Sequence, residues 1–151
     1  MLSMEINGLP LHPLVVHAAV VFGPLAAAAA VTYAVVPRWR DRLRWPMLVA
    51  VIAATASIWA AYYTGINFRA SKDFFNQPPV AAKIDRHAHL AGILRWVTTA
   101  LAVVAVLAAW LHARTGVVRL VLSAGLVVAG VATLVYVALT GDAGAQTVWG
   151  S

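Results

Sequence analysis

The chain has 151 residues, of which 62% are hydrophobic and 11% charged, and it contains no cysteine. Soluble domains are about 45–50% apolar and about 25% charged, so this composition predicts a polytopic membrane protein with one small domain. The net charge is +6, and the basic residues lie in short clusters between apolar runs, which argues against nucleic-acid binding. The absence of cysteine excludes disulfides, thiolate-bound iron–sulfur clusters and covalent c-type haem within these residues.

Apolar runs of about 20 residues predict four membrane-spanning helices. The predicted spans are about 13–36, 46–64, 87–112 and 120–140. Pro13 and Pro46 stand where helices begin, and Gly65 and Gly141 follow the second and fourth runs, as helix-ending glycines do. No Lys or Arg precedes the first run, so we expect no cleaved signal peptide. The predicted fold is an all-α, four-helix transmembrane bundle, up-down-up-down, with residues 1–151 as one membrane domain.

The connections between the runs predict the orientation. The first connection, "PRWRDRLRW", carries four arginines and one aspartate, and the third, "HARTGVVR", carries two arginines and no acid. Basic loops of membrane proteins favour the cytoplasmic side, so we expect both termini and the connection at 65–86 to face outward from a bacterial cytoplasmic membrane.

The two halves of the chain resemble each other in outline. Each begins with a histidine pair and continues through a span, an arginine-bearing turn and a second span that ends in Thr-Gly. Thr64 and Thr140 are 76 positions apart, as are Arg38 and Arg114. The pattern is consistent with two tandem helical hairpins related by a pseudo-two-fold axis, although any two hydrophobic hairpins share much of it.

Four histidines are expected at one level of the membrane because the first and third helices enter from the same side. Neutral imidazole ligates transition metals and haem iron, and ionisable groups inside membranes are usually functional. We expect His17, the deepest, to ligate a metal centre, most simply a b-type haem, with His87 or His89 opposite. His12 diverges from His17 by roughly 140° around the helix, so we expect it to orient the site or bind a propionate. Arg86 and Arg95 are the expected propionate partners.

Other interpretations stay open. Histidines near the interface can face headgroups or cap helices, and Arg95 can extend toward the surface along its aliphatic stem. The chain would then be a cofactor-free structural or accessory subunit. A transporter or metal-handling protein is disfavoured by the lack of acidic residues within the spans. No Ser/His/Asp grouping, HExxH or Walker sequence suggests an enzyme.

Four short motifs carry a family resemblance: "LHPLVVH", the "TG" after the second span, "IDRHAHLAG" and "TGDAGAQTVWG". Together they resemble a domain-of-unknown-function family of small bacterial four-helix membrane proteins whose first helix has an HPxxVH signature. The resemblance implies an integral membrane module that is fused elsewhere to Rieske iron–sulfur or c-type cytochrome domains. We therefore expect either a homodimer or a complex with a redox partner protein of the kind that the resemblance implies. By position, His12, Pro13 and His17 match the signature, and His87 matches the histidine that opens the third helix.

Overall fold

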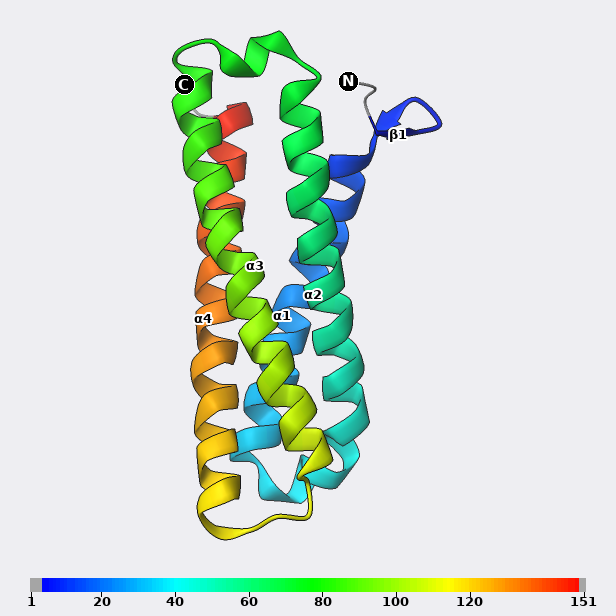
Figure 1. Cartoon of the computed structure of the whole chain (residues 1–151), viewed down its shortest axis with the longest axis vertical. Helices are drawn as coiled ribbons and strands as arrows, with labels where there is room; N and C mark the ends of the chain where they lie inside the picture. The colour runs from blue at the N-terminus through cyan, green and yellow to red at the C-terminus, as the bar shows by residue number, and fades with distance from the viewer. Residues whose placement is uncertain (1–3, 150–151) are drawn as a thin grey trace.

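The computed structural model describes residues 4–149 and consists almost entirely of four long helices. They run alternately up and down along one axis, which confirms the all-α four-helix bundle (Figure 1). Short 3-10 turns, η1 (Pro37–Trp39) and η2 (Asp73–Asn76), lie in the first two connections, and two-residue strands β1 (Glu5–Ile6) and β2 (Leu9–Pro10) pair ahead of the first helix. The helices are α1 (Leu11–Val35), α2 (Arg40–Ala70), α3 (Val80–Trp110) and α4 (Gly116–Trp149).

The helices form a closed ring in which each packs against two neighbours. The contacts join α1 to α2, α2 to α3, α3 to α4 and α4 back to α1, so α1 and α3 face each other across the bundle axis. Small residues permit close approach: a Cβ atom added at Gly130 of α4 would lie 3.0 Å from Cγ2 of Val31 in α1. All four helices are long and apolar enough to span a membrane. In each helix, only 22–28% of the residues in its 18-residue hydrophobic stretch are buried inside the bundle. The remaining apolar surface is suited to contact with lipid.

The helix ends differ from the predicted span ends. The second helix begins at Arg40, so Pro46 lies inside α2, and Gly65 and Gly141 lie inside α2 and α4. The predictions that Pro46 begins a helix and that the two glycines end helices are therefore wrong. Hydropathy detects the apolar window, whereas the helices continue through the polar residues beyond it. At about 1.5 Å per residue the 31 residues of α2 extend about 46 Å, more than the roughly 30 Å hydrocarbon core.

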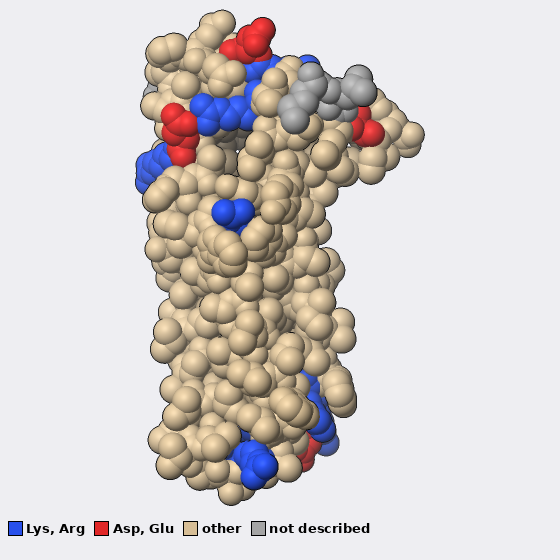
Figure 2. All heavy atoms as spheres, viewed as in Figure 1, with Lys and Arg blue, Asp and Glu red and all other residues tan. Residues whose placement is uncertain are grey.

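The two ends of the bundle differ in charge, and Figure 2 shows charged atoms gathered at both ends with a largely uncharged middle. We call the end with the two termini and the connection at 71–79 the histidine end, because His12 and His87 lie there. The end with the connections at 36–39 and 111–115 is the arginine end. His112 lies at the arginine end, away from the other histidines, as its position in the sequence predicts.

Candidate metal centre

A cavity of about 70 Å³ lies between all four helices at the histidine end. Each helix contributes one polar residue to it: His12 in α1, Tyr62 in α2, His87 in α3 and Thr140 in α4. Small and aliphatic side chains line most of the rest, among them Ala19, Ala61, Ala91 and Gly141. The buried Oγ1 of Thr140 has no hydrogen-bond partner among the described residues. A buried polar atom without a partner is uncommon, so the cavity offers a place for a polar ligand.

The geometry around His12 sets its tautomer. Nδ1 lies 3.0 Å from the carbonyl oxygen of Ala61 and 3.3 Å from Oγ1 of Thr64, both in α2. A carbonyl oxygen only accepts, so Nδ1 carries the hydrogen and donates it. In the neutral ring Nε2 then keeps its lone pair, and no described residue forms a hydrogen bond with Nε2. His12 is thus oriented by one nitrogen and leaves the other available to a ligand.

His87 has the same arrangement in the second hairpin. Its Nδ1 lies 3.0 Å from the carbonyl oxygen of Thr140 in α4 and donates to it. The Nε2 atom likewise has no hydrogen-bond partner among the described residues. Each histidine therefore donates to the helix that follows its own in the chain. Metal-binding histidines commonly hold their second ring nitrogen in this way, which fixes the ring orientation and the basicity of the ligating nitrogen.

Two glycines make room for the rings. A Cβ atom at Gly65 of α2 would lie 3.0 Å from Cε1 of His12, and one at Gly144 of α4 would lie 3.1 Å from Cε1 of His87. Contacts of that length displace a neighbour, so larger side chains at either position would push the ring out of place. The two hairpins thus use the same combination of a histidine, a carbonyl and a glycine.

The two imidazoles face each other across the bundle. Their ring centroids are 6.5 Å apart, and the ring planes make an angle of 75°. Two imidazoles on opposite sides of one metal, each with a metal–nitrogen distance of about 2 Å, place their centroids roughly 6 Å apart. The observed separation is close to that value. Among residues 4–149 no group of three or more His, Cys, Asp or Glu side chains gathers, so this pair would supply two protein ligands.

The structure brings together His12 and His87 and leaves His17 and His89 elsewhere. His17 is exposed, and its Nδ1 lies 2.6 Å from the carbonyl oxygen of Pro13 in its own helix. His89 is exposed as well, and neither residue lines the cavity. The reason is helical phase: His12 and His17 diverge by roughly 140°, so a helix that turns His12 inward turns His17 toward lipid. The two histidines that line the cavity are therefore His12 and His87.

The two predicted propionate partners also lie outside the cavity. Arg86 is exposed. The guanidinium of Arg95 lies 4.0 Å from the ring centroid of Tyr62, 4.9 Å from that of Trp59 and 5.4 Å from that of Trp96. Arg95 is thus held by cation–π contacts in the seam between α2 and α3, and Tyr62 separates it from the cavity.

Sequence reasoning missed the residues that hold the histidines in place. Thr64 and Gly65 form the first Thr-Gly pair, and Thr140 belongs to the second. We interpreted these pairs as helix ends, but each contributes a hydrogen-bond acceptor to a histidine. The matching spacing of the pairs in the two halves was the available indication that they act with the histidines.

A b-type haem fits the donor set and does not fit the volume. Two neutral imidazoles with carbonyl partners suit haem iron. Pockets for ligands of drug size are about 300–1,000 Å³, whereas this cavity is about 70 Å³. In this arrangement the space suits a metal ion, and a macrocycle would require the side chains between the helices to move apart.

The model of a family described as "Predicted membrane protein (DUF2231)" matches residues 8–151. No curated protein and no solved structure matches the chain.

Proposed function

The chain belongs to the DUF2231 family of predicted membrane proteins, and we propose that it is a redox module in which His12 and His87 ligate one transition-metal centre within the bundle. The observation that carries the proposal is the 6.5 Å separation of two rings whose Nδ1 atoms both donate to backbone carbonyls. This arrangement leaves two imidazole lone pairs at one cavity, and imidazole suits copper and iron, two metals that can change oxidation state. The cavity volume favours a bare ion.

A b-type haem is the second candidate, and one observation favours it. The cavity extends two helical turns from the histidines, to Val20 and Leu94, and small residues of all four helices line it. A macrocycle would enter this space only if the helices moved apart at the histidine end, because the cavity is about 70 Å³. Arg95 is too firmly stacked on aromatic rings to be its first propionate partner, and Arg86 is exposed toward solvent or headgroups.

The test is metal content and optical spectroscopy of the purified protein. We would express the chain with haem supplied, measure bound metal by elemental analysis, and record oxidised and dithionite-reduced spectra. The variants His12→Ala and His87→Ala remove the proposed ligands. His17→Ala and His89→Ala are matched controls, because these exposed histidines lie outside the cavity.

The outcomes separate the alternatives. We expect one metal per chain in the wild type and in both controls, and loss of metal in His12→Ala and His87→Ala. A Soret band that accompanies the metal identifies haem, and metal without the band identifies a bare ion. Absence of both in the wild type would overturn the proposal in favour of a cofactor-free structural subunit. Loss of metal in His17→Ala with retention in His12→Ala would overturn the ligand pair.

We place the electron partner of this module at the histidine end, outside a bacterial cytoplasmic membrane. The proposed centre lies close to that end of the bundle, and short distance favours electron transfer. A Rieske-type or c-type cytochrome partner is the class that the family resemblance implies. Reoxidation of the dithionite-reduced protein by a purified c-type cytochrome tests this, and reoxidation no faster than that by buffer alone would count against it.

The proposal also includes a homodimer. The lipid-facing sides of the helices carry small residues as well as large ones, and small residues allow helices to associate in membranes. Light scattering of the detergent-solubilised protein at low detergent excess should give the mass of two chains after subtraction of bound detergent. A single-chain mass under gentle conditions would remove the dimer from the proposal.

A further inference from the structure

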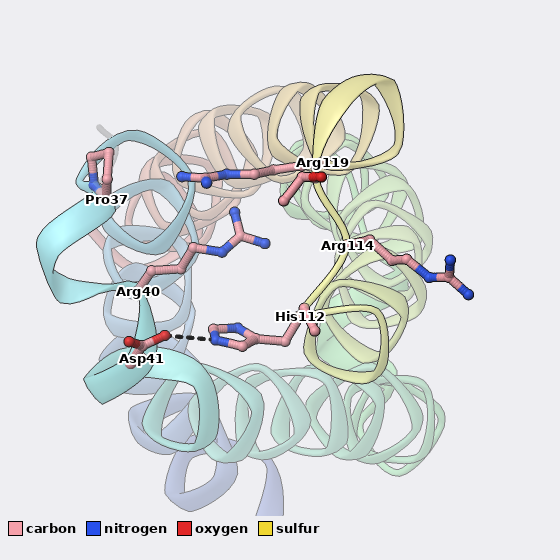
Figure 3. Close-up of a pocket in the computed structure, with 8 residues that line it drawn as sticks. Pro37, Arg40, Asp41, His112, Arg114 and Arg119 are labelled. Atoms are coloured by element: carbon pink, nitrogen blue, oxygen red, sulfur yellow. Dashed lines mark hydrogen bonds and ion pairs between the residues drawn. The ribbon is translucent and has the colours of Figure 1, made fainter.

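The arginine end contains a second cavity, of about 410 Å³, between the α1–α2 and α3–α4 connections. Figure 3 shows its labelled residues. The guanidinium groups of Arg40, from the start of α2, and Arg119, from α4, extend into the space between the helices. Arg114 points away from it. Two cations from different hairpins thus converge on one cavity.

Arg40 is buried without a partner for its charge. The residue is only 6% exposed, and its guanidinium lies 4.7 Å from the ring centroid of Tyr33. Its Nη1 atom is buried and forms no hydrogen bond to any described residue. A buried cationic group normally pairs with an anion because desolvation of an unpaired charge is costly. Nη1 of Arg40 therefore lacks an acceptor that an anion in the cavity could supply.

The one carboxylate that lines the cavity is already engaged. Asp41 accepts a hydrogen bond of 2.7 Å from Nε2 of His112. Nδ1 of His112 lies 2.8 Å from the Tyr33 hydroxyl, which also lies 3.0 Å from the carbonyl oxygen of Ala108. No ion pair joins Arg40 or Arg119 to a carboxylate within residues 4–149. The cavity therefore keeps an excess of positive charge.

The arginines, and not the helix directions, account for this charge. Both α2 and α4 begin at the arginine end, but α1 and α3 end there, so positive and negative ends of the helix dipoles offset one another beside the cavity. Residues 113–115, which precede α4, form part of its wall. Helix N-termini and arginines together are a common environment for phosphate groups.

We propose that this cavity binds a phosphate group, held by the guanidinium groups of Arg40 and Arg119. Guanidinium presents paired N–H donors that match phosphate oxygens, and the contact is a charge-assisted hydrogen bond. The same chemistry is offered by the headgroup of an anionic phospholipid and by free phosphate. Basic pockets between transmembrane helices are known to accept lipid headgroups, and this cavity lies at the end of the bundle where headgroups reside.

The experiment has two arms, which distinguish the sources. In the first, inorganic phosphate is titrated into the detergent-solubilised protein at constant ionic strength set with chloride, and binding is measured by calorimetry. In the second, native mass spectrometry compares retention of phosphatidylglycerol and phosphatidylcholine from mixed micelles. The variants Arg40→Gln and Arg119→Gln test the cavity, and Arg114→Gln is the matched control because its side chain points away. Circular dichroism checks that each variant is helical. Because Arg119 is only partly buried, Arg119→Gln remains informative if Arg40→Gln does not fold.

We expect the wild type to bind phosphate or to retain phosphatidylglycerol over phosphatidylcholine. Each cavity variant should lose about tenfold or more in affinity, the usual cost of a hydrogen bond to a charged group. Saturable phosphate binding assigns the site to the free anion, and selective retention of phosphatidylglycerol alone assigns it to a lipid headgroup. Absence of both in the folded wild type, or an equal loss in Arg114→Gln, would overturn the proposal.

Discussion

Gly65 and His12 lie so close together that a side chain on residue 65 would crowd the imidazole: a Cβ atom on Gly65 would lie 3.0 Å from Cε1 of His12. The two residues belong to neighbouring helices, and the His12 ring rests on the backbone of α2 where it donates to Ala61. The glycine thus determines how deeply the ring sits. Gly144 does the same for His87 in the other hairpin.

Substitution of these glycines should impair the metal centre. In Gly65→Ala and Gly144→Ala the new methyl group would push the imidazole by a few tenths of an ångström and strain its hydrogen bond to the carbonyl. We expect metal affinity to fall about tenfold, as for impairment of an orienting partner. Metal titration of the purified variants measures this. Gly141→Ala is the matched control, because its Cβ would meet no atom within 4 Å although Gly141 also lines the cavity. That control should keep its affinity and gain up to about 1 kcal/mol in helix propensity. Equal losses in all three variants would contradict the role assigned to the glycines.

Tyr33→Phe should destabilise the arginine end. The Tyr33 side chain is 1% exposed, and its hydroxyl contacts Ala108 of α3 and His112 of the following connection, across the bundle. Removal of the hydroxyl leaves Nδ1 of His112 without this partner, so we expect a loss of about 1–2 kcal/mol in the free energy of unfolding. Denaturant unfolding in mixed micelles measures it. The exposed Tyr63 provides the comparison, since Tyr63→Phe should change stability by less than about 0.5 kcal/mol. Indistinguishable variants would show that the hydroxyl contributes nothing.

Arg95→Gln should cost stability without affecting the centre. Three aromatic rings surround the guanidinium, and loss of these cation–π contacts should lower the free energy of unfolding by about 1 kcal/mol. Arg86→Gln, at an exposed position, should have little effect. Thermal unfolding and the optical spectrum are measured on the same samples. A shifted haem spectrum in Arg95→Gln at unchanged stability would instead assign Arg95 to a propionate.

The orientation can be tested with single cysteines because the chain has none of its own. Trp39 at the arginine end and Gln77 at the histidine end are both exposed. We expect a membrane-impermeant maleimide to label Gln77→Cys in intact cells and to label Trp39→Cys only after the membrane is opened. Labelling of position 39 from outside would reverse the predicted topology.

The number of helices and their antiparallel order could be predicted because hydropathy measures the property that a membrane selects. The helix ends could not, since hydrogen bonding within a helix continues beyond the apolar window: α2 passes Gly65 and ends at Ala70, and α3 begins at Val80. Pro46 is tolerated inside α2, as prolines often are in membrane helices. Glycine and proline are therefore weak evidence of where a helix begins or ends in a membrane protein.

The choice among the histidines shows a different limit. Their angular separation follows from helix geometry, and the sequence predicts that His12 and His17 point in different directions. In the structure His12 lines the cavity and His17 is exposed. Which of them faces inward depends on the rotation of the helix, and α1 is apolar on nearly every side. A helix of that kind has no polar face to mark its exposed side. Packing of Ala26, Ala27 and Ala30 into the core determines the rotation, and His12 turns inward as a result.

Each hairpin carries one histidine together with its own carbonyl and its own glycine, and the connection at 71–79 is the covalent link between them. Each half of the molecule therefore carries one of the two proposed ligands, and the proposed centre would form only where the halves meet. A metal bound by both histidines would then hold α1–α2 and α3–α4 together. If the chain is cut within that connection, its two fragments should associate more tightly with metal than without it. Metal bound per pair of fragments would then measure how much of the bundle has reassembled.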